Sequence, residues 1–178
     1  RAAKKKMNIT CDITAYQPLL DDSMLAGFDT NYKTNPPLRT KSDNDSLIKA
    51  LKDGTIDVIT SGHTPQDEES KSIEFDHADA GIINLQTFAA NLVLLSKDVK
   101  WDVLIDKVTT GPRAVLGLKQ PSIDVDAKAN LTLLDPNREW KFDEKTNLSK
   151  SKNSPWFNQT LTGKAVAVFN NDKQWLDL

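Results

Sequence analysis

Two short runs of apolar and β-branched residues constrain the fold of this chain more than any other feature. They cover residues 8–14 and 56–60, and a helical pattern with Leu47 and Leu51 on one side separates them before Gly54. Runs of this length form buried strands, and strands that alternate with helices usually build parallel sheets. The sequence therefore predicts an α/β fold.

The helix between the two runs has a candidate start signal. Ser42 has the side chain of an N-cap residue, and Asp45 follows three positions later. This spacing is typical of a capping box, so we expect the helix to begin at Ser42. Residues 1–6 are rich in lysine and are typical of the last turns of a helix, where cations are favoured. Since the chain does not open with Met, we expect that it begins inside a longer protein.

The pattern changes along the second half of the chain. Helical spacing predicts three further helices, at residues 83–95, 101–108 and 112–116. Beyond Ala129 the pattern favours short strands at 131–134, 138–142 and 164–170, the last followed by a turn at Asn171 and Asp172. The strand and helix alternation is too short for a complete eight-stranded barrel.

The charge balance excludes several classes of partner. The 178 residues carry 23 basic and 25 acidic side chains, a formal net charge of -2. Such a chain has no strong field to attract nucleic acid or an anionic membrane, and no apolar run approaches the roughly 20 residues of a membrane span. A single cysteine, Cys11, cannot form an internal disulfide. We therefore expect one cytoplasmic domain that binds neither nucleic acid nor membrane.

Few residues in the chain could hold a metal ion. A hydrolytic metal site needs several His, Asp, Glu or Cys side chains at one point, and this chain has only His63, His77 and Cys11 besides its carboxylates. We interpret His77 as a solvated loop histidine. His63 follows the second strand, where α/β proteins bind ligands, so two interpretations stay open: a pocket residue, or a histidine hydrogen-bonded to loop backbone.

The segment from Asn35 to Arg39, Asn-Pro-Pro-Leu-Arg, is the other unusual stretch. Its two prolines fix φ and favour an extended conformation for Asn35. A rigid loop of this kind can orient an amide toward a ligand, or it can brace the rim of a fold. The residues themselves support both interpretations equally.

Several of these segments, taken in order, resemble the dihydroorotase family. Residues 31–39 look like its Asn-Pro-Pro-Leu-Arg loop, 53–59 like the run before its Thr-Asp-His-Ala-Pro-His, and 80–87 like its Phe-Gly-Ile and Glu-Thr stretch. Residues 112–118 are similar to its Pro-Ala-Arg-Ile-Leu-Gly-Leu, and 148–155 to its Leu-Ser-Lys-X-Lys-Asn-Thr-Pro. The order of these matches, over nearly the whole chain, identifies it as a member of that family.

The resemblance implies a fold and a place within it. The family has an amidohydrolase (β/α)8 TIM barrel and a small β-sandwich built from both chain ends. Residues 1–118 would then supply the last strands and helices of the barrel, and residues 119–178 the C-terminal strands of the sandwich. The family's His-X-His and further zinc ligands would lie upstream of Arg1, so the chain would need its own N-terminal half or a second copy.

The departures from the family pattern concern its chemistry. Gly62 stands where the family has the Asp that binds zinc and acts as general base, and Gln66 where a histidine contacts the substrate carboxylate. The strand-end Thr-Pro-His-His becomes Thr-Ala-Tyr-Gln, which ends in Tyr16 and Gln17. The family's substrate-binding positions that remain, or that are substituted, are Asn35, His63, Gln66, Ala80 and Gly81.

These departures lead to three hypotheses. The first is a catalytically silent dihydroorotase homologue that serves as a scaffold for aspartate carbamoyltransferase in pyrimidine biosynthesis, with no catalytic residue, metal or other cofactor expected on this chain. The second is an active zinc-dependent cyclic amidohydrolase, interconverting dihydroorotate and carbamoyl aspartate, with a modified metal site. The third is a sensor that keeps a small-molecule pocket around Asn35 and Gln66.

Overall fold

The computed structural model describes residues 7–177, so the helix end expected at residues 1–6 lies outside the described part. The elements follow one another along the chain as β1 (Asp12–Thr14), the 3-10 helices η1 (Asp22–Gly27) and η2 (Thr30–Tyr32), α2 (Lys41–Lys52), β2 (Val58–Thr60), α3 (Glu68–Lys71), α4 (Phe88–Leu95), α5 (Trp101–Val108), α6 (Thr110–Val115), β3 (Asn130–Phe142), β4 (Gln159–Asn170) and β5 (Lys173–Leu176). Within the described residues, strands and helices alternate only up to β2; four helices, α3 to α6, follow, and then the three strands β3 to β5.

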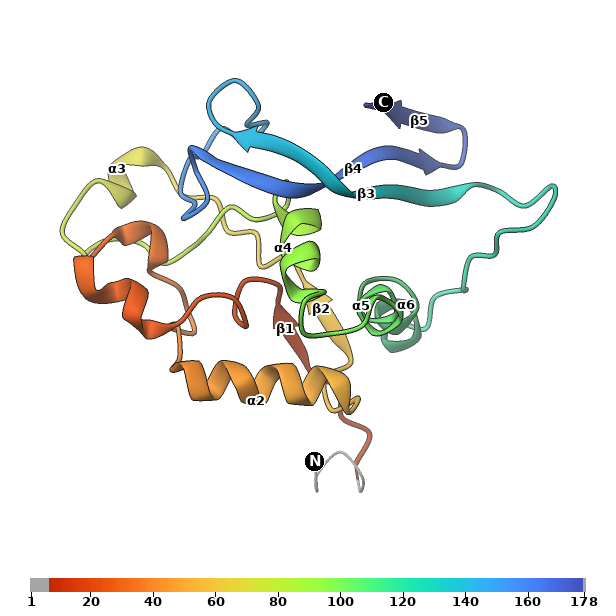
Figure 1. The fold of residues 1–178 in the computed structure, drawn as a ribbon, viewed down its shortest axis with the longest axis horizontal. Coiled ribbons are helices and arrows are strands. Elements are labelled where there is room, and N and C mark those ends of the chain that lie inside the picture. The colour runs from red at the N-terminus through yellow and green to blue at the C-terminus, as the bar shows by residue number, and fades with distance from the viewer. Residues whose placement is uncertain (1–6, 178) are drawn as a thin grey trace.

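The first sheet is the parallel pair predicted from the two β-branched runs. β1 and β2 lie side by side in the middle of the molecule (Figure 1), with Ile13 opposite Ile59. Each strand is shorter than predicted, because ladder pairing is confined to three residues of each run. Before β1, the Asp57 N–H donates to the Cys11 carbonyl, and the Asp57 carboxylate accepts a hydrogen bond from the Cys11 N–H.

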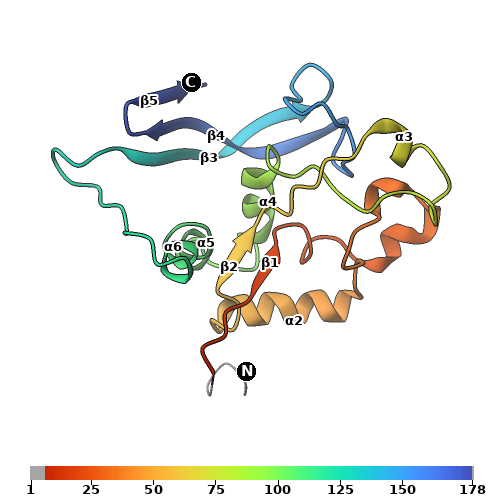
Figure 2. The same ribbon diagram turned by 180° about the vertical axis from the view of Figure 1, so that it is seen from behind.

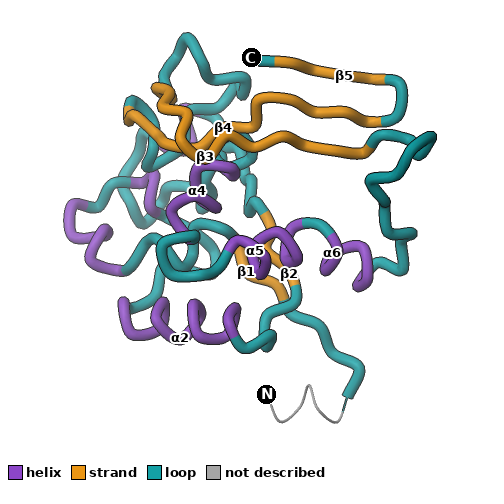
Figure 3. The backbone as a smooth tube through the Cα atoms, turned by 45° about the vertical axis from the view of Figure 1, so that its right-hand side comes forward, coloured by secondary structure: helices purple, strands orange, loops and turns teal. Residues whose placement is uncertain are grey.

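The second sheet is antiparallel, in the order β3, β4, β5, and forms a separate layer across the molecule (Figure 3). The two strands predicted at 131–134 and 138–142 are one strand, β3, which stays paired with β4 through irregularities after Leu133 and Asp135. β5 was not predicted. Its backbone pairs with β4 after the expected turn at Asn171, although its side chains are exposed and lack the pattern of a buried strand.

Helix α2 begins earlier than predicted. Its N-cap is Thr40, whose hydroxyl accepts a hydrogen bond from the Asp43 N–H, while the Asp43 carboxylate accepts one from the Thr40 N–H. The expected cap at Ser42 is therefore wrong, because Thr40 and Asp43 already form the reciprocal pair two residues upstream. The polar stretch after β2 also contains one unpredicted helical turn, α3, which the Asp67 carboxylate caps.

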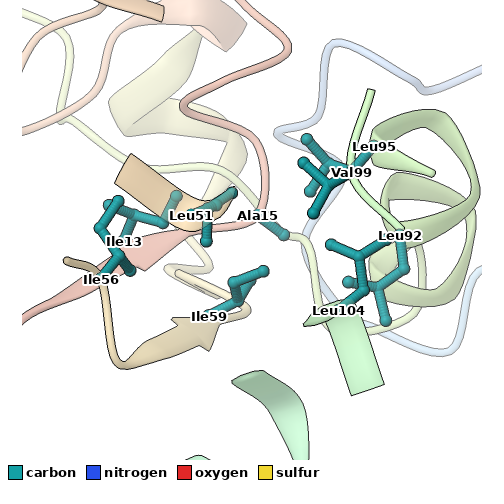
Figure 4. Close-up of a cluster of buried hydrophobic side chains, with 9 residues drawn as sticks. All are labelled: Ile13, Ala15, Leu51, Ile56, Ile59, Leu92, Leu95, Val99 and Leu104. Atoms are coloured by element: carbon teal, nitrogen blue, oxygen red, sulfur yellow. The ribbon is translucent and has the colours of Figure 1, made fainter. Parts of the chain in front are cut away.

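Helix α4 connects the two sheets (Figures 1 and 2). On one side, its Leu92 and Leu95 join buried residues of β1, β2, α2 and α5 in the cluster drawn in Figure 4. On the other side it contacts β4, where Gly163 lies so close that an added Cβ would be 2.4 Å from Val93 Cγ2. The packing of α4 therefore fixes the ends of β1 and β2 relative to the second sheet.

Candidate functional site

The carboxyl end of β2 lies directly against the end of β1. Gly62 has a left-handed backbone with φ of +62°, and a Cβ built on it would be 2.5 Å from Thr14 Cγ2 and 2.7 Å from Tyr16 Cε1. Carbon atoms do not approach this closely without displacement, so the space beside Gly62 is already filled. We call Thr14, Tyr16 and Gly62 the strand-end site.

Tyr16 and Gln17, which the family resemblance places at the positions of a histidine pair, are both engaged within the chain. Tyr16 is buried, and this burial raises the pKa of its hydroxyl. The neighbouring Thr14 side chain lowers the same pKa, but by less. Gln17 turns back on β1: its Oε1 accepts a hydrogen bond from the Thr14 N–H at 2.9 Å, and its N–H donates to the Thr14 carbonyl. The strand-end site is thus uncharged and closed by its own side chains.

His63 follows Gly62 and is held by loop backbone. Its Nδ1 accepts hydrogen bonds from the N–H groups of Asn84 at 3.0 Å and Leu85 at 3.1 Å. The structure therefore shows the hydrogen bonds to loop backbone that one interpretation of His63 predicts. Because Nδ1 is an acceptor, the neutral ring carries its proton on Nε2. The ring also lines a cavity of about 270 Å³, bordered by Phe142 and Leu148.

Three of the other predicted pocket residues, Gln66, Ala80 and Gly81, are connected by hydrogen bonds of Gln66 and Asn153. Gln66 Nε2 donates to the Ala80 carbonyl at 2.9 Å, and the Gln66 N–H donates to Asn153 Oδ1. The buried Asn153 amide nitrogen donates to the carbonyls of Thr64 and Gly81, both at 3.0 Å. The Gln66 amide nitrogen and the carbonyls of Ala80 and Gly81 therefore already have hydrogen-bond partners inside the protein.

Asn35 belongs to a pair of loops that two lysines hold together. The peptide bond between Asn35 and Pro36 is cis, and the Asn35 side chain is exposed. Lys33 Nζ donates to the carbonyls of Phe75 and Asp76, and the Gly81 N–H donates back to the Lys33 carbonyl at 2.8 Å. We call residues 28–35 and 71–81 together the loop clamp.

The second lysine of the loop clamp is buried. Lys71 Nζ donates to the carbonyls of Thr30, Asp79 and Gly81, at 2.5, 2.8 and 3.5 Å. Burial lowers the pKa of this ammonium; the charge of Lys33 adds to the effect, while Asp29 and Asp79 oppose it. The ammonium thus joins the 28–35 loop, at Thr30, to the backbone carbonyls of Asp79 and Gly81.

The described residues do not by themselves supply the ligand set of a hydrolytic metal centre. Within residues 7–177, no three His, Cys, Asp or Glu side chains gather in a way that could hold a metal ion. His77 is remote from such a role, because its side chain is 73% exposed beside Asp76. Gly62 offers no ligand, and its neighbours occupy the volume that a carboxylate would need.

Sequence reasoning located the strand-end site but missed two residues that organise the loops. Asn153 lies within the 148–155 segment used for the resemblance, and that segment was the only available signal for it. Lys71 gave no signal, since a lysine after Glu68, Glu69 and Ser70 is typical of a solvated surface. Its burial follows from loop packing that local sequence does not specify.

The chain is similar in sequence to known proteins. No family model matches the chain. A dihydroorotase from Carboxydothermus hydrogenoformans is 40% identical over 171 residues, which cover 93% of this chain and 40% of that protein. The chain therefore spans about two fifths of the length of this relative.

None of the helices within residues 7–177 has the length and apolar character needed to cross a bilayer.

Solved structures show the same fold. The L-hydantoinase (dihydropyrimidinase) from Arthrobacter aurescens matches 97% of this chain with a TM-score of 0.83 at 21% identity, over 40% of its own length. The inactive dihydroorotase-like domain of a CAD-like multifunctional protein from Chaetomium thermophilum matches 97% with a TM-score of 0.67 at 18% identity, over 45% of its length. The chain thus has an amidohydrolase-like α/β fold, as the sequence predicts.

Proposed function

The chain is a homologue of the dihydroorotases over most of its length, and we propose that it is part of a dihydroorotase-like protein that has lost hydrolysis and acts as a scaffold. The observation that carries this proposal is the filled space beside Gly62, where Thr14 and Tyr16 occupy the volume of the missing carboxylate. Acid-base help to an attacking water is worth about 10² to 10⁴ in rate, so its loss alone would nearly silence an enzyme.

We extend the proposal to the architecture. Residues 1–118 correspond to the last strands and helices of a (β/α)8 barrel, and residues 119–178 to the C-terminal strands of a β-sandwich. A two-stranded parallel sheet, a second sheet across α4 and relatives about two and a half times as long support this division. A groove of about 710 Å³ between residues 8–10 and α6 offers a place for further polypeptide.

The missing part of the barrel would come from the protein's own N-terminal half or from a second copy, because an open sheet leaves strand edges without partners. Size-exclusion chromatography of residues 1–178 alone tests this step. We expect aggregates or oligomers, and a well-behaved monomer would contradict the need for a second half.

The partner that we propose for the scaffold is aspartate carbamoyltransferase, in the cytoplasmic synthesis of pyrimidines. The solved inactive dihydroorotase-like domain is described as part of a CAD-like multifunctional protein, which supports a place in a larger assembly. Sedimentation velocity of the full-length protein mixed with aspartate carbamoyltransferase from the same organism should show a complex of both. Separate boundaries at micromolar concentrations would contradict this partner.

The alternative is an active cyclic amidohydrolase with a modified zinc site, favoured by the 40% identity to a dihydroorotase. Metal analysis of the purified full-length protein separates the two functions: stoichiometric zinc favours the enzyme, and its absence favours the scaffold. A sensor pocket around Asn35 and Gln66 has less support, since the Gln66 amide already binds the Ala80 carbonyl. Thermal shifts with dihydroorotate and carbamoyl aspartate test it, and no shift is expected.

A further inference from the structure

The cavity of about 270 Å³ beside His63 is lined by the residues just before α4, the end of β3 and the chain that follows it. Two of its lining residues, Ile83 and Phe142, are buried. Two others, Leu85 and Leu148, are 64% and 88% exposed. Of the positions that the family resemblance assigns to the substrate, only His63 lines it. The cavity is therefore separate from the strand-end site and the loop clamp.

One side of the cavity is a loop that Gln86 fastens to the start of α4. The Gln86 Oε1 accepts a hydrogen bond from the Leu148 N–H at 2.9 Å, and its Nε2 donates to the Thr146 carbonyl at 2.6 Å. Within the loop, Asn147 Oδ1 accepts from the Ser149 N–H at 3.0 Å. The Leu148 backbone is thus held at the cavity, although its exposed side chain gains little from burial in the fold.

His63 gives the cavity a hydrogen-bond donor in a fixed orientation. Because its Nδ1 accepts from the N–H groups of Asn84 and Leu85, the ring proton is on Nε2, which has no hydrogen-bond partner within residues 7–177. Asn84 is itself held by buried contacts: its Nδ2 donates to the Ser61 carbonyl, and its Oδ1 accepts from the Thr87 hydroxyl, both at 2.7 Å. The donor is therefore oriented before any ligand binds.

The lining of the cavity favours an uncharged ligand. Among the described residues, no Lys, Arg, Asp or Glu side chain lines it. The Gln86 and Asn147 amides are already bonded to the loop, so the side-chain donors that remain are His63 Nε2 and the Ser149 hydroxyl. A carboxylate would enter without a cation to pair with, which is costly, whereas a neutral carbonyl oxygen needs only a donor.

We propose that this cavity binds an uncharged carbonyl compound with an apolar body, of about ten non-hydrogen atoms in all. Its carbonyl oxygen accepts a hydrogen bond from His63 Nε2, and its apolar body contacts Phe142 and the exposed Leu85 and Leu148. Apolar walls with a few convergent polar groups are the usual form of a small-molecule site. The anionic dihydroorotate does not match this lining, and the proposal holds whether or not the full-length protein hydrolyses anything.

Two probes of nearly the same shape, 2-phenylacetamide and phenylacetate, test the charge selection with the full-length protein. Isothermal titration calorimetry should give a Kd of about 1 mM or below for the amide, as expected for a small ligand in a preformed cavity. The anion should bind at least about tenfold more weakly, because its carboxylate would be desolvated without a cation. No binding of the amide, or equal binding of the anion, would overturn the proposal.

A pair of variants locates the binding. Leu148→Asp changes a lining side chain that is 88% exposed, so the fold should persist while the affinity for the amide falls at least about fivefold. The matched control is Ile123→Asp, which is 84% exposed and does not line the cavity, and should leave the affinity within about twofold. Circular dichroism checks that both variants are folded. Equal affinities of the two variants would contradict the site.

A crystal structure of the full-length protein with 2-phenylacetamide tests the role of His63. The amide oxygen should lie within hydrogen-bond distance of His63 Nε2, with the phenyl ring against Phe142. An amide bound elsewhere would overturn the proposal. A cavity that is filled by residues upstream of Arg1 would also overturn it, because the space would then belong to the fold.

Discussion

The strand-end site and the loop clamp differ in the side chains that occupy them and in the charge of those side chains. At the strand-end site, Thr14 and Tyr16 occupy the space beside Gly62, and the groups present are uncharged. In the loop clamp, polar groups remain abundant, and the ammonium groups of Lys33 and Lys71 bind them. The first region is filled by its own side chains, whereas in the second the loops are held together by hydrogen bonds from two ammonium groups.

This difference separates two things that an active site needs. A hydrolytic metal centre requires a free coordination position and charged ligands. A small residue in place of a ligand can remove both, if neighbouring side chains fill the space. A loop scaffold requires only that its backbone groups be satisfied, and Lys71 and Asn153 achieve this without a ligand. Loss of catalysis and retention of shape are therefore compatible in one molecule.

The largest effect that we predict follows from adding a methyl group at the strand-end site. Gly62→Ala should lower the free energy of unfolding of the full-length protein by about 3 kcal/mol, because the new Cβ meets Thr14 and Tyr16 and the backbone is left-handed. Urea denaturation measures this. The matched control is Gly117→Ala, which has φ of +67° but no atom within 4 Å, and should cost only about 1 kcal/mol. Equal costs would mean that the space beside Gly62 is open.

The next effect concerns the loop clamp. Lys71→Met should cost about 2 kcal/mol, because the carbonyls of Thr30 and Asp79 would lose a charged donor inside the protein. Lys33→Met should cost about 1 kcal/mol, because Lys33 is less buried and water can replace it. Urea denaturation of both variants checks the order. A larger loss for Lys33→Met would place the main support of the loops elsewhere.

A smaller effect follows from the charge of Lys71. Burial lowers the pKa of its ammonium in the folded protein below the ordinary value of 10.5, so the unfolded chain binds more protons at a pH between the two pKa values. The contribution of Lys71 to the free energy of unfolding should therefore rise with pH in that window. The stability difference between the natural protein and Lys71→Met should grow from pH 8 toward pH 10.5. A difference that shrinks would contradict the direction of the shift.

The smallest effect is expected at the exposed edge of the loop clamp. Phe28→Asn should change the free energy of unfolding by less than about 1 kcal/mol, because asparagine tolerates the left-handed backbone and the lost ring is mostly in water. Thermal unfolding measures it. A loss above about 2 kcal/mol would mean that Phe28 supports the fold.

The sequence predicted elements whose signals are local. Helix α5 has the predicted bounds, because apolar residues recur at helical spacing from Trp101 to Val108. The cap of α2 was misplaced by two residues, since Thr40 and Asp43 carry the same signal as Ser42 and Asp45. β5 was missed because its exposed side chains carry no periodic pattern, and only pairing with β4 defines it.

For the candidate site, too, the sequence predicts only what local residue patterns carry. Motif order placed Gly62 just after a strand, and the family resemblance implies a carboxylate at this position. Motif order did not reveal that Tyr16 fills the space beside Gly62, or that Lys71 is buried against Thr30. Both features depend on contacts between segments more than 40 residues apart in the sequence. Residue types predict what chemistry is missing, and tertiary packing decides what replaces it.

The rate of dihydroorotate hydrolysis by the purified full-length protein, measured with saturating zinc beside the Carboxydothermus hydrogenoformans dihydroorotase, tests the central claim most directly. With the position beside Gly62 filled by Thr14 and Tyr16, the rate should fall at least about 10² to 10⁴ below that of the relative. Turnover within tenfold of the relative would contradict the account, because it would require a working general base where the structure has none.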